Sequence, residues 1–126
     1  MNIYTTYFGN LRNLPNDIVP VAICGKTPDS WEGLKYPALA PKKWWWAIWK
    51  YKKNEDLDYY RGMYEETVLK ALTPQTVIDD LEKMSNGKDV ALVCYEKPDS
   101  FCHRRLVADW LMHSGISVYE YEKADK

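Results

Sequence analysis

The sequence contains no apolar run approaching the roughly eighteen residues that a membrane-spanning helix needs. Its first residues, MNIYTTYFGNL, lack the basic region and long apolar stretch of a secretory leader. Cysteines are few, and their number, three, is odd, which does not suit a disulfide framework. We therefore expect a soluble cytoplasmic protein with no membrane association, whose cysteines remain thiols in a reducing compartment.

A charge excess of either sign is also missing. Seventeen basic residues balance eighteen acidic ones, so no overall field attracts nucleic acid or an anionic membrane, although a local patch still could. The chain of 126 residues is 46% hydrophobic, which is enough for a core without cross-links. We expect one compact domain over residues 1–126.

Several catalytic motifs are absent. The sequence has no glycine-rich phosphate loop, no Gly-x-Ser-x-Gly, no His-x-Glu followed by Pro-Cys-x-x-Cys, and no glycine-rich turn for a dinucleotide. These absences argue against ATP, NAD and deaminase chemistry. We expect no cofactor.

What is present is an alternation of strand-like and helix-like segments. Short apolar runs predict strands over Ile3–Phe8, Asp17–Cys24, Asp89–Tyr95 and Ile116–Tyr121. Apolar residues at helical spacing predict helices over Leu57–Leu72, Pro74–Ser85 and Cys102–His113, and prolines and glycines predict a long ordered loop over Gly25–Pro41. The pattern indicates an α/β fold, with a small, mostly parallel sheet flanked by helices.

Two of these segments carry sharper signals. Thr73 is a predicted N-cap with Pro74 at the first helical position, and Asn86-Gly87 ends that helix. The near-continuous apolar run DVALVCY is typical of a strand covered on both faces, so it is the candidate central strand.

The stretch CYEKPDSFCHRRL, Cys94 to Leu106, leaves that strand and opens the last helix. Ligands bind at this rim of open α/β sheets. Cys102 is at the predicted helix start, where the helix dipole and the neighbouring Arg104 favour a thiolate. Helical spacing turns His103 inward, and Glu96 follows the strand within possible reach of it. The stretch is therefore either a site with an activated thiol or a structural connection in which Cys94, Cys102 and His103 fill core.

A zinc site is the competing interpretation. Cys94, Glu96, Cys102 and His103 include good zinc ligands, and Cys24 could join them from another strand. The spacing lacks a Cys-x-x-Cys knuckle and places two of the ligands side by side. We therefore expect no metal.

The stretch LVCYEKPDSFCHRRLVADWL resembles the signature of domain-of-unknown-function family 488, in which Cys-x-Glu is followed by a short loop and Cys-His-Arg. The match covers Cys94, Glu96, Cys102, His103 and Arg104. YFGNLRNLP, which contains Gly9 and Asn10, resembles a short bacterial and phage branch of that family. The resemblance implies a compact α/β fold in which these residues form one site, and no settled activity. The family pattern also has a basic residue at the end of the second strand, where this chain instead has Cys24-Gly25-Lys26. Lys26 is the candidate substitute as anion ligand, and the departure weakens the expectation of an anionic substrate.

A second unusual stretch is KKWWWAIWKYKK, Lys42 to Lys53. Aromatic rings beside lysines can stack bases and hold phosphates, which would make a nucleic-acid-binding surface. The alternative is a short helix whose tryptophans pack on the sheet while the lysines stay in water.

Three hypotheses follow. The first is a small enzyme for a nucleotide, nucleic-acid base or phosphate-bearing metabolite. In it Cys102 is the nucleophile or a contact residue, His103 the acid or base and Glu96 its orienter. Arg104 binds an anion, and Cys94, Asn10, Gly9 and Lys26 also bind the ligand. The second is a non-catalytic module that binds nucleic acid or protein through the Lys/Trp segment. The third is a phage or host interaction protein whose Cys-His-Arg cluster is structural.

Overall fold

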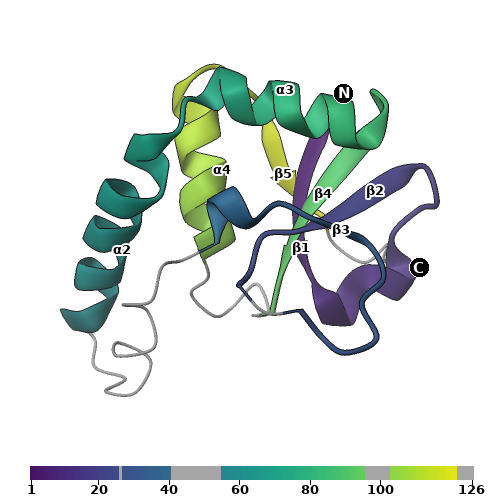
Figure 1. Cartoon of the computed structure of the whole chain (residues 1–126), viewed down its shortest axis with the longest axis horizontal. Coiled ribbons are helices and arrows are strands. Elements are labelled where there is room, and N and C mark those ends of the chain that lie inside the picture. The colour runs from purple at the N-terminus through teal and green to yellow at the C-terminus, as the bar shows by residue number, and fades with distance from the viewer. Residues whose placement is uncertain (26, 41–54, 96–102, 122–126) are drawn as a thin grey trace.

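The computed structural model describes residues 1–25, 27–40, 55–95 and 103–121 (Figure 1). Its centre is a five-stranded sheet in the order β3-β2-β4-β1-β5, and every pair of neighbours is parallel. The strands are β1 (Ile3–Tyr7), β2 (Ile18–Ala22), β3 (Leu34–Lys35), β4 (Asp89–Cys94) and β5 (Val118–Glu120). The predicted α/β fold with a parallel sheet is confirmed.

The described helices all connect strands of this sheet. They are α2 (Glu55–Thr67), α3 (Pro74–Ser85) and α4 (His103–His113), with 3-10 helices η1 (Phe8–Asn13), η2 (Pro37–Leu39) and η3 (Leu69–Ala71). Figure 1 shows α2 and α4 side by side at one flank, and α3 across the end of the sheet where the chain begins.

Two expectations about local structure were wrong. The helix expected over Leu57–Leu72 ends at Thr67, and a separate 3-10 turn, η3, follows it. The segment expected as a loop over Gly25–Pro41 contains β3 and η2. β3 has only two residues, so it depends on pairing with Val21 and Ala22 of β2 and has too little sequence to show a strand pattern of its own.

The two sharpest predictions are confirmed. The Thr73 hydroxyl accepts a hydrogen bond from the backbone N–H of Thr76 at 3.2 Å, which caps α3. Asn86 ends the helix in the left-handed conformation, with φ of 57°. β4 is the central strand, paired with β2 and β1 and buried along nearly its whole length.

Side chains alternate between the two faces of the sheet. Tyr7 of β1 and Cys94 of β4 lie on the face that α4 covers, as contacts from Arg104 show. Thr6 lies on the opposite face, where Asn10 of η1 bonds to it. The carboxyl ends of the strands therefore lie between the first turn of α4 and η1, the region in which parallel sheets bind ligands.

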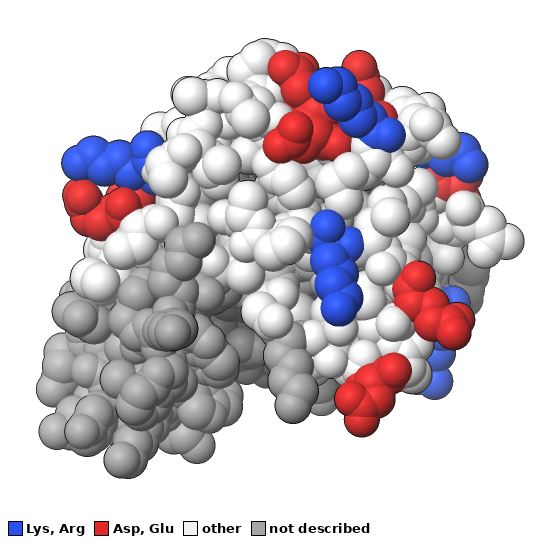
Figure 2. All heavy atoms as spheres, viewed as in Figure 1, with Lys and Arg blue, Asp and Glu red and all other residues white. Residues whose placement is uncertain are grey.

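The described surface carries charges of both signs. In Figure 2 acidic and basic side chains are scattered among uncharged residues on the visible face. This agrees with the balanced composition. Among the described helices, none is long and apolar enough to cross a membrane.

Candidate functional site at the carboxyl edge of the sheet

Arg104, the second residue of α4, has no solvent exposure at all. Its guanidinium donates two hydrogen bonds to the Glu120 carboxylate at the end of β5, from Nε to Oε1 at 3.1 Å and from Nη2 to Oε2 at 3.0 Å. The Thr5 hydroxyl donates to the same Oε1 at 2.6 Å. Thr5 and Glu120 are register partners in the β1–β5 pair, so the strand pairing itself sets the position of the carboxylate. This two-point geometry fixes the direction of the guanidinium plane.

The remaining guanidinium nitrogen of Arg104, Nη1, points at the sulfur of Cys94. Nη1 donates to Sγ of Cys94 at 3.1 Å, and the guanidinium carbon lies 5.9 Å from the ring centre of Tyr7. Tyr7 and Cys94 are register partners at the ends of β1 and β4. When Cys94 is reduced, the guanidinium beside its sulfur favours the thiolate over the thiol. Arg104 is thus aimed at Cys94.

The cysteines differ in redox state. Cys94 is buried and disulfide-bonded, whereas Cys24 is outside any disulfide and of intermediate exposure. The expectation that the cysteines remain thiols is therefore wrong at Cys94. The sequence could not show it, because the separation of two cysteines along the chain does not reveal the distance between their sulfurs.

His103 is 5% exposed and faces inward, as its helical position predicted. Its Nε2–H donates to the backbone oxygen of Ile23 at 2.8 Å, and its ring lies 5.6 Å from that of Tyr64. Burial lowers the pKa of His103 to about 4; the nearby charge of Arg104 lowers it further and the bond to Ile23 opposes the shift. The imidazole is therefore neutral at pH 7. In that tautomer the proton is on Nε2 and Nδ1 is the basic nitrogen.

Asn10 connects two chain segments at this edge. Its side-chain amide donates to the Thr6 hydroxyl at 3.1 Å and to the backbone oxygen of Tyr121 at 3.0 Å. Its oxygen accepts from Asn13 at 2.8 Å. The neighbouring Gly9 is exposed, and a Cβ there would come within 3.2 Å of the Tyr7 ring. The hydrogen bonds of Asn10 hold η1 against the chain that follows β5.

The structure thus brings five of the predicted residues to one edge of the sheet: Gly9, Asn10, Cys94, His103 and Arg104. Glu96, Cys102 and Lys26 lie outside the described residues, as does the Lys/Trp segment Lys42 to Lys53, so their roles remain predictions. Within the described part of the chain, no group of three or more His, Cys, Asp or Glu side chains could hold a metal.

The sequence analysis missed Glu120, Thr5 and Tyr7. The reasoning applied to Glu96, an acidic residue at the end of a strand, applies equally to Glu120 at the end of the predicted strand Ile116–Tyr121. That signal was present in the sequence. The pairing of Glu120 with Arg104 could not be predicted from the sequence, because it depends on β5 lying beside β1.

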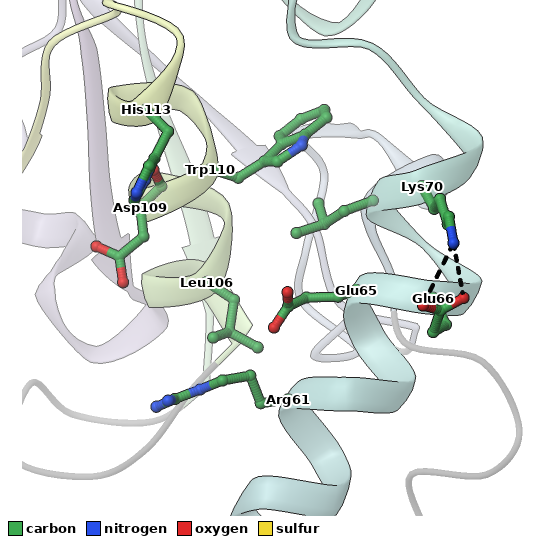
Figure 3. A pocket seen from close by; sticks show the side chains of 9 residues that line it. Arg61, Glu65, Glu66, Lys70, Leu106, Asp109, Trp110 and His113 are labelled. Atoms are coloured by element: carbon green, nitrogen blue, oxygen red, sulfur yellow. Dashed lines mark hydrogen bonds and ion pairs between the residues drawn. The ribbon is translucent and has the colours of Figure 1, made fainter.

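A separate groove of about 550 Å³ lies between α2 and α4. Figure 3 shows Trp110 of α4 projecting toward α2, with Leu106 and Glu65 below it and the Lys70–Glu66 ion pair at the far rim. The groove is lined by Arg61, Glu65, Glu66, Leu69, Lys70, Leu106, Asp109, Trp110 and His113. None of the predicted site residues that the structure describes lines this groove.

No curated protein and no solved structure matches the chain. A family model does match, over residues 7–115, and its description is "Active DUF488-N3 subclade". The matched span runs from the end of β1 past the end of α4, so it contains Gly9, Asn10 and the whole Cys-x-Glu and Cys-His-Arg stretch. The resemblance drawn from that stretch is confirmed, and the chain belongs to the DUF488-N3a family.

Proposed function

We propose that the protein is an enzyme that acts on a nucleotide, a nucleic-acid base or a phosphate-bearing metabolite, with its site at the carboxyl edge of β1, β4 and β5. Two facts support this proposal. The family is described as an active subclade, and polar side chains from α4, β1 and β5 meet at the sheet edge that most often binds ligands in this architecture.

The observation that carries the proposal is the buried arginine. Removing a guanidinium from water is costly, and a well-packed apolar side chain would often give equal or greater stability. Arg104 is nevertheless completely buried and oriented by Glu120, with one N–H directed at Cys94. A fixed positive charge beside a sulfur is an arrangement suited to stabilising negative charge that develops during a reaction.

The geometry of the described residues supports particular roles for Arg104 and His103. Arg104 directs its donors at Glu120 and Cys94, so we assign it electrostatic stabilisation at Cys94 and leave the substrate anion to Lys26. His103 is neutral at pH 7, so it acts as a proton acceptor through Nδ1 and not as a standing acid. In the reduced protein, Cys102 as the nucleophilic thiol and Glu96 as the orienter of His103 complete the proposal.

The test is conversion of a compound panel followed by mass spectrometry. In buffer that contains a dithiol, nucleosides, nucleotides, free bases and sugar phosphates are incubated with the wild-type protein, with Cys102→Ser, and with Lys70→Gln as the matched control. Lys70 is on the exposed flank of the groove between α2 and α4. We expect a product with the wild type and Lys70→Gln, and loss of about 10²-fold or more in rate with Cys102→Ser. No product from any class, or equal rates for all three proteins, would overturn the proposal.

A further inference from the structure

Three aromatic side chains that are far apart in sequence meet beside the candidate site. Phe8 begins η1 directly after β1, Trp31 lies between β2 and β3, and Tyr95 follows β4. The ring centres of Phe8 and Trp31 are 5.3 Å apart with planes at 79°, and those of Phe8 and Tyr95 are 4.8 Å apart with planes at 56°. These three residues, the aromatic wall, all follow carboxyl ends of strands.

The wall is partly open to water. Tyr95, which directly follows the buried strand β4, is 48% exposed. The indole of Trp31 packs closely over Gly33, where a Cβ would come within 2.6 Å of Cζ2. The exposed ring of Tyr95 beside the closely packed ring of Trp31 gives a further flat group an aromatic surface to bind.

Trp31 has a second distinctive property. Its Nε1 is the one buried side-chain nitrogen or oxygen without a hydrogen-bond partner in the part of the chain that the structure describes. Buried donors are nearly always paired, since an unpaired one loses its bond to water without replacement. A small shift of the indole against a ligand that carries an acceptor would restore that bond.

The aromatic wall lies next to residues of the candidate site. Tyr95 is adjacent to Cys94, whose sulfur accepts from Arg104. Successive residues of a strand project to opposite faces, so the wall and the Arg104 cluster lie on the two sides of one sheet edge. A flat ring against Tyr95 would place its substituents near that edge.

We propose that the aromatic wall binds the nucleobase of the substrate, with Tyr95 stacking on the ring and the Nε1–H of Trp31 available to a ring nitrogen or carbonyl. This inference rests on the proposed function and narrows its substrate class to base-bearing compounds. Purine and pyrimidine rings have a flat face, which could stack on Tyr95, and acceptor atoms, which could bind the Nε1–H of Trp31.

The experiment follows the indole N–H signals of ¹⁵N-labelled protein by NMR during titration with adenosine, guanosine, cytidine and uridine. The Trp31 signal is identified by its loss in Trp31→Phe. Ribose 5-phosphate, which has no base, is the control compound. We expect at least one nucleoside to shift the Trp31 signal in a saturable way, and ribose 5-phosphate to leave it unchanged.

Two variants give a matched comparison. Tyr95→Leu removes the stacking face and should weaken nucleoside binding about tenfold or more. Tyr119→Leu removes a tyrosine that is 58% exposed on β5 and should leave the affinity unchanged. Tyr95→Phe keeps the ring and should bind like the wild type, which separates stacking from a role of the hydroxyl.

The outcomes distinguish this inference from the proposed function. If sugar phosphates are converted while no nucleoside moves the Trp31 signal, the wall is a packing cluster and the inference fails while the enzyme stands. If nucleosides bind and Tyr95→Leu weakens them, but no compound is converted, the enzyme proposal fails and the wall remains a base-binding surface. Equal affinities of Tyr95→Leu and Tyr119→Leu would also overturn the inference.

Discussion

Arg104 and Glu120 are sixteen residues apart in sequence, yet Glu120 holds two of the guanidinium nitrogens, Nε and Nη2, at 3.1 and 3.0 Å. Arg104 is fully buried, and the Glu120 side chain is 20% exposed. Because Glu120→Gln would leave a buried charge without its counter-ion, we expect it to lower the free energy of unfolding by about 3 kcal/mol. Urea denaturation at pH 7 measures the change.

The matched control is the ion pair between Lys70 and Glu66, 3.3 Å apart with side chains 72% and 65% exposed. Glu66→Gln should change the free energy of unfolding by less than about 0.5 kcal/mol, because water screens this pair. If Glu120→Gln and Glu66→Gln lower the free energy of unfolding by similar amounts, the buried ion pair of Arg104 contributes no more to stability than the exposed one.

His103 makes stability depend on pH. Its pKa in the folded protein is lowered by burial to about 4, below the ordinary value of about 6.5 in the unfolded chain. Between these two values the unfolded chain binds more protons, so the free energy of unfolding rises with pH from about 4 to about 6.5 and is then constant. The full effect is about 3 kcal/mol.

Denaturation of wild type, His103→Gln and His113→Gln at a series of pH values isolates this effect. We expect His103→Gln to flatten the profile between pH 5 and 6.5, where most carboxyl groups are already ionised. His113 is an exposed residue at the end of α4, so His113→Gln should keep the wild-type slope. A wild-type slope in His103→Gln would assign the pH dependence to other groups.

The reactivity of the cysteines tests the thiolate predicted at Cys102. After reduction with a dithiol, which also opens the disulfide of Cys94, alkylation mapped by mass spectrometry should label Cys102 faster than Cys24 or Cys94 at neutral pH. The labelling midpoint of Cys102 should lie below about 8.5, and Cys102→Ser should remove the fast phase. A midpoint at or above about 8.5 would leave Cys102 as a structural residue.

The Lys/Trp segment gives a prediction for the alternative, non-catalytic function. If Lys42 to Lys53 binds single-stranded nucleic acid, replacing its five lysines by glutamine should weaken that binding and flatten its dependence on salt. Fluorescence anisotropy with a labelled oligonucleotide at low salt measures both. If the unmodified protein does not bind the oligonucleotide, this non-catalytic function is ruled out.

Several parts of the fold could be predicted because they depend on neighbouring residues. Thr73 and Asn86 cap and end α3 through bonds within one helical turn. The apolar run Asp89–Cys94 needs cover on both faces wherever the chain goes, so its central position followed from composition. The inward direction of His103 followed from helical periodicity alone.

The sequence by itself determined the class of fold, the ends of α3, the central strand and the family, since each depends on local periodicity or on a short motif. The tertiary structure decided that Glu120 neutralises Arg104, that Arg104 points at Cys94, and that Phe8, Trp31 and Tyr95 form one wall. Those contacts join segments whose separation in sequence carries no information about their distance in space. Only the order of the strands, with β1 between β4 and β5, brings them to the same edge.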